Sequence, residues 1–157
     1  MFDKNEFIVS SSFGICKVEK VTKLVVGREK QMEYYVLQSP ADKKKKSYIP
    51  VSHHETVLRK PMTEEEAKNI LEKMVIYGKE IKGETHYTLE EGRQVLETGD
   101  PEKWGLFASF YLKKNLEMDQ EKREVFGKIW ENLQGELAFV LKKNLEDIRQ
   151  MAENGVK

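Results

Sequence analysis

The hydrophobic pattern of this 157-residue chain changes its period near residues 60–62, and this change constrains the fold more than any other feature. Upstream, short runs of β-branched and aromatic residues are separated by turn residues, whereas downstream apolar residues recur at intervals of three and four. Alternation is typical of strands, and a period of about 3.6 residues is typical of helices. The chain is therefore predicted to be an α+β protein, with a β domain at residues 1–60 and a helical domain at residues 61–157.

Five short strands are predicted in the first sixty residues. The segment Glu33–Leu37 has the strongest β-propensity, and Pro50 directs the following strand towards a sheet edge or a strand end. Because closure of a sheet hides its edge strands, five short strands in so few residues favour a small antiparallel barrel. The predicted strands are Phe7–Val9, Ile15–Val26, Glu33–Leu37, Ser47–Val51 and Thr56–Leu58.

Four to five helices are predicted after residue 61, because their starts carry clear capping signals. Thr63–Glu66 and Thr88–Glu91 each have the spacing of a capping box, in which a Thr hydroxyl and a Glu carboxylate satisfy the first backbone amides. Asp100-Pro101 places an N-cap residue before a proline at the first helical position. Asp119 and Asn144 are expected to cap the two later helices. Trp104 and Trp130 lie on apolar stripes at helical spacing and are predicted to pack in the core.

The composition excludes several classes of protein. Charged residues make up 34% of the chain, and no apolar run approaches the ~20 residues that a membrane-spanning helix needs. The single Cys16 excludes an intramolecular disulfide and a multi-cysteine zinc site, and it is predicted to be a small buried hydrophobe. The start of the chain shows no apolar segment of a secretory signal, so the cytoplasm is the expected location.

Charge is distributed unevenly although the net charge is zero. Residues 1–60 carry 12 Lys and Arg against 7 Asp and Glu, a net charge of +5, and residues 61–157 carry 15 against 20, a net charge of −5. Charge alone therefore does not mark the helical domain as a nucleic-acid binder. No heptad seam points to an oligomer, so a monomer is expected.

Motifs for catalysis and for cofactor or metal binding are missing from the sequence. There is no phosphate loop, nucleophile elbow or zinc-binding helix motif. The adjacent pair His53-His54 is poorly placed for one metal ion, because neighbours in a strand point to opposite faces. The acidic runs at Glu64–Glu66 and Glu90–Glu91 fall in the first turns of predicted helices, where carboxylates favour the positive end of the helix dipole. We therefore expect no enzyme, no cofactor, no metal and no small-molecule substrate.

Two features of the β domain are candidates for recognition of a partner. Tyr34 and Tyr35 must point to opposite faces of their strand, so one is expected in the core and the other outside. An outward tyrosine near a strand edge suits recognition by an added strand, or it covers a neighbouring side chain. The run Lys43–Lys46 fits either a basic loop that meets phosphates or an acidic protein, or a solvated hairpin tip.

The order of these segments resembles the CarD-like family of bacterial transcription regulators, and the first part also resembles the polymerase-interacting module of the transcription-repair coupling factor. The resemblance covers nearly the whole chain and rests on an ordered set of short motifs. These are Phe7-Ile8-Val9, Gly14-Ile15-Cys16-Lys17-Val18-Glu19, Gly27, Glu33-Tyr34-Tyr35-Val36-Leu37, Ile49-Pro50-Val51, Leu58-Arg59, Leu96-Glu97-Thr98-Gly99-Asp100 and Glu136-Leu137-Ala138.

The resemblance implies a Tudor-like barrel joined to a compact helical domain, without catalysis. It implies that the barrel binds the β subunit of RNA polymerase along a strand edge, here at Lys23, Glu33, Tyr34, Tyr48 and Ile49. Where the family usually has Tyr-Pro-x-His before its first glycine, this chain has Ser10-Ser11-Ser12-Phe13.

The resemblance further implies that the helical domain contacts promoter DNA upstream of the melted region and modulates the stability of the open complex. The family's aromatic wedge, which enters the minor groove, falls at Thr85, and the nearest aromatic residue is Tyr87. Lys79 and Lys82 are the nearby candidates for contacts with DNA. The alternative is an adaptor of the same fold that binds polymerase or another protein but has lost minor-groove binding.

Overall fold

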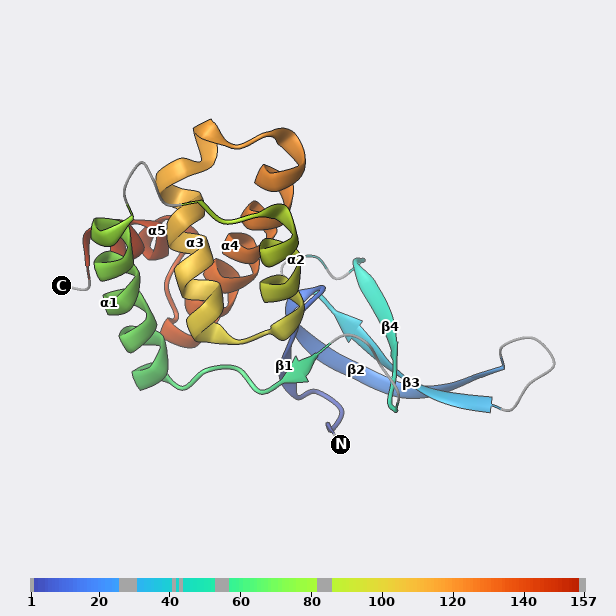
Figure 1. Ribbon diagram of the computed structural model, residues 1–157. Coiled ribbons are helices and arrows are strands. Elements are labelled where there is room, and N and C mark those ends of the chain that lie inside the picture. Colours follow the sequence, from blue (N-terminus) through green and yellow to red (C-terminus); the bar gives the residue numbers. More distant parts are fainter. Residues whose placement is uncertain are drawn as a thin grey trace. The chain divides into compact units, whose positions relative to one another are not determined.

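The computed structural model describes residues 2–25, 31–40, 42, 44–52, 57–81 and 86–155 (Figure 1). The chain divides into two compact units, Met1–Pro61 and Met62–Lys157. A five-stranded antiparallel sheet makes up the first unit, and five α-helices make up most of the second. The predicted α+β fold, with an N-terminal β domain and a helical C-terminal part, is confirmed.

The strands of the sheet are all antiparallel to their neighbours and follow the order β4-β3-β2-β1-β5. Each predicted strand has its counterpart here, although the last begins at Leu58, and Thr56 lies outside the described residues. β2 and β3 form the longest ladder, with an irregularity between Val18 and Lys20. The strands are β1 (Phe7–Ser10), β2 (Gly14–Val25), β3 (Gln31–Gln38), β4 (Lys46–Pro50) and β5 (Leu58–Arg59).

One face of the sheet forms the core of the first unit. Tyr35 is 2% exposed and its hydroxyl accepts a hydrogen bond from the amide of Phe2 at 3.1 Å, so its ring is fixed on the core side. Tyr34 is only half-buried, which confirms that one of the two tyrosines enters the core and the other points outward. The buried core cluster consists of Ile8, Cys16, Val18, Tyr35, Leu37 and Ile49.

The turn between β1 and β2 is built by serine hydroxyls. Ser10 Oγ accepts hydrogen bonds from the amides of Ser12 at 3.3 Å and Phe13 at 3.2 Å. Ser11 Oγ accepts one from the amide of Val57 at 3.1 Å. Gly14 then adopts a φ of 80°, which glycine reaches without the cost that a Cβ would add. Side-chain hydrogen bonds therefore hold this turn, and Phe13 packs against the core cluster.

The helices of the second unit begin at the predicted capping residues. Both capping boxes are complete, and Asp100, Asp119 and Asn144 each accept a backbone amide as N-cap. A short 3₁₀ turn, η1 (Asn115–Glu117), separates the third helix from the fourth. The helices are α1 (Glu64–Glu80), α2 (Leu89–Thr98), α3 (Pro101–Lys114), α4 (Gln120–Leu141) and α5 (Leu145–Asn154).

The helical core is centred on α3, which packs against α1 and α4 (Figure 1). Trp104 is fully buried and donates its indole N–H to the carbonyl of Val95 at 3.0 Å, and Trp130 is 6% exposed, so the predicted core roles of both are confirmed. The carboxylate of Glu136, also fully buried, accepts the backbone N–H of Met62 at 2.8 Å. This bond anchors the first residue of the helical unit to α4.

Candidate protein-docking edge

The edge strand β4 is the feature of the first unit best suited to bind another chain. Within the described residues, β4 pairs with β3 on one side and with no strand on the other. An unpaired strand edge presents a row of backbone N–H and C=O groups, which another polypeptide can satisfy by adding a strand.

Hydrogen bonds at both ends of β4 fix the direction of its backbone groups. The amide of Val51 donates to the carbonyl of Glu33 at 2.9 Å, and the amide of Ser39 donates to the carbonyl of Lys45 at 3.1 Å. In an antiparallel ladder, the residues that bond to the neighbour alternate with residues that point away from it. Odd-numbered residues of β4 therefore bond to β3. Tyr48 consequently directs its main-chain N–H and C=O to the open edge.

The side chain of Tyr48 lies on the face of the sheet opposite the core cluster. Tyr48 pairs in register with Val36, whose side chain is buried, and Tyr34 pairs with Pro50, so these four side chains project from the same face of the sheet. Tyr48 is 55% exposed and Met32 is 38% exposed, while Tyr34 is half-buried. An aromatic and apolar strip thus crosses β3 and reaches the open edge at Tyr48. We call Met32, Tyr34, Tyr48 and Pro50 the outer strip.

The structure brings some of the predicted polymerase contacts together and separates others. Lys23 on β2 lies directly opposite Glu33 on β3, one residue pair beyond the pair of Thr22 with Tyr34. Both Lys23 and Glu33 are exposed, and opposite charges at such cross-strand positions attract. Ile49 is different, because its side chain is 5% exposed in the core and its backbone groups face β3. Ile49 supports the edge from inside the sheet.

The lysine run lies in the connection between β3 and β4. Lys46 forms an ion pair with Glu19 at 3.0 Å, and the ammonium of Lys45 lies 5.5 Å from the centre of the Phe13 ring. Lys44 is exposed, and Lys43 lies outside the described residues. Two of these lysines therefore already interact within the first unit. Lys44, Lys45 and Lys46 are all exposed, so both interpretations of the run, a basic recognition loop and a solvated hairpin tip, stay open.

The predicted DNA contacts of the helical unit are not brought together as a set. Lys79 is exposed in the last turn of α1, and Lys82 and Thr85 lie outside the described residues. Tyr87 packs its ring against Phe107, with centroids 4.5 Å apart, and against Phe110 at 4.9 Å. Burial raises the pKa of the Tyr87 hydroxyl, and the nearby carboxylate of Glu91 raises it further. The ring of Tyr87 is thus engaged in packing within its own unit.

Pro50 and Met32 are members of the outer strip that the sequence analysis did not single out. Pro50 was interpreted only as a sign of an edge strand, and Met32 lay between a turn and a strand. Met32 shares a face with Tyr34 through alternation along β3, whereas the register of β3 with β4 was needed to place Pro50 beside Tyr34. Period-two alternation within one strand cannot show which residue of the next strand lies alongside.

Other kinds of site find little support in the residues that the structure describes. Burial raises the pKa of the Cys16 thiol to about 12, which keeps it protonated and unreactive, as expected for a buried hydrophobe. No group of three or more metal-ligating side chains occurs in the described part of the chain, and His53-His54 lies outside it. Among the described helices, none combines the length and apolar character needed to cross a bilayer.

Comparison with known proteins assigns the unit that carries this edge. No curated protein sequence matches the chain. Residues 2–62 match the CarD-like/TRCF RID domain family, a domain of interaction and not of catalysis. The match covers all five strands, including the open edge of β4 and the outer strip, and it ends where the helical unit begins. Residues 2–62 of this chain therefore form a CarD-like/TRCF RID domain.

Proposed function

We propose that this protein regulates transcription by binding the β subunit of RNA polymerase through the open edge of β4. The observation that carries the proposal is the position of Tyr48 within the matched domain. Its backbone N–H and C=O point away from β3, and its ring is 55% exposed beside that edge. The family match supports RNA polymerase as the partner, and the edge geometry supports strand addition as the mode of binding.

Strand addition at β4 uses two kinds of contact that can be separated. Main-chain hydrogen bonds to Tyr48 contribute affinity, while the outer strip contacts side chains of the added strand. A single net hydrogen bond contributes about 0.5–1.5 kcal/mol, and a buried aromatic contact at the centre of an interface contributes about 2 kcal/mol or more. Removal of the Tyr48 ring should therefore weaken binding more than removal of its N–H alone.

The proposal is tested by calorimetric titration of the full chain with the isolated β lobe of the polymerase. Tyr48→Ala removes the ring but keeps the N–H, and Tyr48→Pro removes both, at a position where the N–H is not used by the sheet. Wild type should bind at micromolar concentrations or tighter. Tyr48→Ala should weaken binding at least tenfold, and Tyr48→Pro should weaken it further. Leu116→Ala alters an exposed apolar residue of the helical unit and serves as the matched control.

Two results would contradict this assignment. One is an absence of binding by the wild-type chain at tens of micromolar. The other is equal binding by wild type and by Tyr48→Pro, provided that circular dichroism shows both to be folded. In the second case another surface of the RID domain holds the polymerase.

For the helical unit we propose the role of a protein-binding adaptor without insertion into the minor groove. The supporting observation is Tyr87, whose ring packs on Phe107 and Phe110 and is not presented as a wedge. The net charge of −5 in residues 61–157 also opposes a close approach to phosphates. Measurement of promoter-DNA affinity against salt separates the two roles. An adaptor gives weak affinity and a flat salt dependence, whereas a steep slope that falls on Lys79→Gln would establish contact with DNA.

A further inference from the structure

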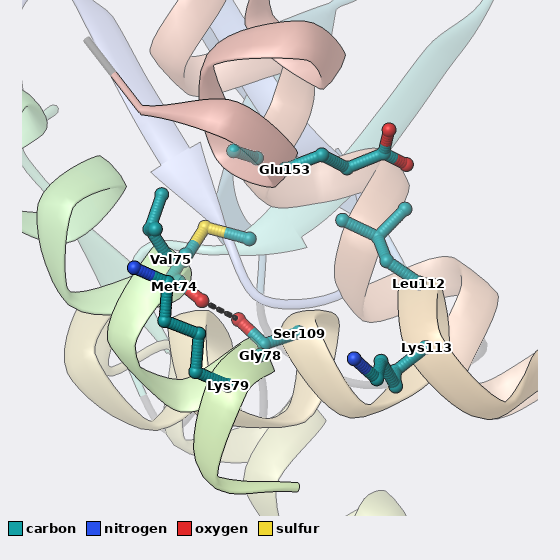
Figure 2. A pocket seen from close by; sticks show the side chains of 9 residues that line it. Met74, Val75, Gly78, Lys79, Ser109, Leu112, Lys113 and Glu153 are labelled. Carbon is teal, nitrogen blue, oxygen red and sulfur yellow. Dashed lines mark hydrogen bonds between the residues drawn. The ribbon is translucent and has the colours of Figure 1, made fainter.

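A hollow of about 250 Å³ lies in the helical unit, where α1, α3 and α5 approach their C-terminal ends (Figure 2). α1 and α3 run in the same direction, because Gly105 lies against Ile70 and Ser109 bonds to Met74 one turn later. The C-terminal turns of these two parallel helices therefore form part of its wall. Its lining residues are Met74, Val75, Gly78, Lys79, Ser109, Leu112, Lys113, Ala152 and Glu153.

The wall of the hollow is apolar on three sides. Met74 from α1, Leu112 from α3 and Ala152 from α5 line it together. Gly78 leaves the space beside α1 open, because a Cβ at this position would meet nothing within 4 Å. The free energy falls when an apolar group of a ligand replaces water at an apolar surface of this kind. The volume is close to the lower limit for small-molecule sites, so a suitable ligand is compact.

The polar groups of the hollow are not equally available to a ligand. The hydroxyl of Ser109 donates within the fold. Its oxygen lies 2.8 Å from the carbonyl oxygen of Gly105 and 3.3 Å from the carbonyl oxygen of Met74. The carboxylate of Glu153 pairs with Arg149 at 3.4 Å, and Figure 2 shows it directed away from Lys113. In the described part of the chain, the ammonium groups of Lys79 and Lys113 have no acidic partner within 4.0 Å.

We propose that this hollow binds a small amphiphilic carboxylate, such as a medium-chain fatty acid. Its apolar body lies against Met74, Leu112 and Ala152, and its carboxylate meets the ammonium of Lys113. Figure 2 shows that the side chain of Lys113 extends from α3 towards the last turn of α1, where Gly78 opens the space. Lys79 adds a second positive charge at the rim. The site belongs to the helical unit and is independent of the polymerase-binding edge.

A structural role for the two lysines makes a different prediction. Both lie in the last turns of their helices, where a cation also stabilises the negative end of the helix dipole. If that is their whole role, substitution lowers stability slightly and changes no ligand affinity. If the lysines instead contact the ligand, their substitution weakens carboxylate binding and leaves the binding of an uncharged amphiphile unchanged.

The experiment compares octanoate with octanol as probes of the full chain by amide chemical shifts in nuclear magnetic resonance. Octanoate should bind with a Kd on the order of 1 mM, as a ligand of this size allows, and should shift the amides of Ser109, Leu112 and Ala152. Octanol should bind more weakly at the same place. Lys113→Gln should weaken octanoate binding about threefold to fivefold without changing octanol binding, as expected for one exposed charge pair. Lys103→Gln, an exposed lysine of α3 outside the hollow, should change neither.

Filling the hollow provides the second arm of the test. Gly78→Leu places a side chain in the open space and should abolish the binding of both probes. If the leucine variant does not fold, Gly78→Ala takes its place, and this smaller change should reduce the binding of both probes. Equal affinity for octanoate and octanol, or octanoate binding unaffected by Lys113→Gln, would overturn the carboxylate assignment. An absence of shifts at the lining amides would overturn the site itself.

Discussion

Gly92 in α2 lies directly against the ring of Phe126 in α4, so closely that a Cβ on Gly92 would overlap the Cε1 atom of that ring. Phe126 is fully buried and also contacts Phe107 and Phe110, so its ring has little room to move. Gly92→Ala should lower the free energy of unfolding by about 1–3 kcal/mol, as overpacking does in other cores. Urea denaturation measures this change.

Gly78→Ala should have the opposite effect, and it serves as the matched control for the previous prediction. Gly78 is also a helical residue, in the last turn of α1, but a Cβ there meets nothing within 4 Å. Alanine then contributes only its better helix propensity, which should raise the free energy of unfolding by up to about 1 kcal/mol. If both alanine variants change stability in the same direction, close packing of α2 on Phe126 is not the cause.

Glu136→Ala should lower the free energy of unfolding by about 2–3 kcal/mol, because it removes the acceptor of the Met62 amide in a fully buried position. Glu136→Gln keeps an oxygen acceptor of similar shape, so it should cost less. Thermal denaturation of the two variants measures the difference. Equal losses for both would show that the negative charge, and not the hydrogen bond to Met62, stabilises the fold.

Tyr87→Ala should lower the free energy of unfolding by about 2 kcal/mol, because Tyr87 loses its ring contacts with Phe107 and Phe110. Tyr87→Phe keeps those contacts and should be close to neutral. Chemical denaturation and promoter-DNA binding are measured for the same three proteins. A Tyr87→Ala variant that stays stable but loses DNA affinity would contradict the adaptor role, because it would show that Tyr87 contacts DNA as a wedge.

Cys16 should make the stability of the first unit depend on pH in the alkaline range. Its pKa is about 12 in the folded protein against 9.0 for an unperturbed thiol, because burial disfavours the thiolate. The unfolded state therefore releases this proton first. The contribution of Cys16 to the free energy of unfolding is complete below pH 9 and declines by about 1.4 kcal/mol per pH unit from there to about pH 12. The part of the pH slope that Cys16 contributes should be absent in Cys16→Ala.

Labelling of Cys16 by a thiol reagent gives an independent measure of the same burial. At pH 8 the folded protein should react far more slowly than the urea-unfolded protein, because the thiolate is the reactive form. Rapid labelling of the folded chain would contradict the burial of this side chain. In the pH experiment, lysines and tyrosines that titrate in the same range also contribute to the pH slope of the free energy of unfolding. Subtracting the slope of Cys16→Ala from that of wild type removes their contribution.

The local signals of the sequence were sufficient to predict the helix starts and the division into sheet and helices. Thr63 with Glu66 and Thr88 with Glu91 specify capping boxes through atoms only three residues apart, so no tertiary information was needed. That Tyr34 and Tyr35 point to opposite faces likewise followed from alternation within one strand, whereas the structure was needed to show that Tyr35 is the inward one. These features are short-range consequences of backbone geometry.

The features that were not predicted depend on residues far apart in the chain. The contact of Gly92 with Phe126, and the bond from Met62 to Glu136, join segments that no periodicity relates. Glu136 has the sequence character of an exposed helical acid, yet it is fully buried. The outer strip required the register of β3 with β4, and pairing across strands is set by turn geometry and packing and not by the pattern of either strand alone.

The connection between β3 and β4 has an exact length requirement that follows from the pairing of Ser39 with Lys45. One extra residue there, if it slid β4 by a single step, would reverse every side chain of that strand. Ile49 would then meet solvent and the ring of Tyr48 would be driven into the interior. Evolution of this chain can therefore vary the composition of that hairpin tip, but a change in its length preserves the interior and the recognition surface only if it leaves the register of β4 unchanged.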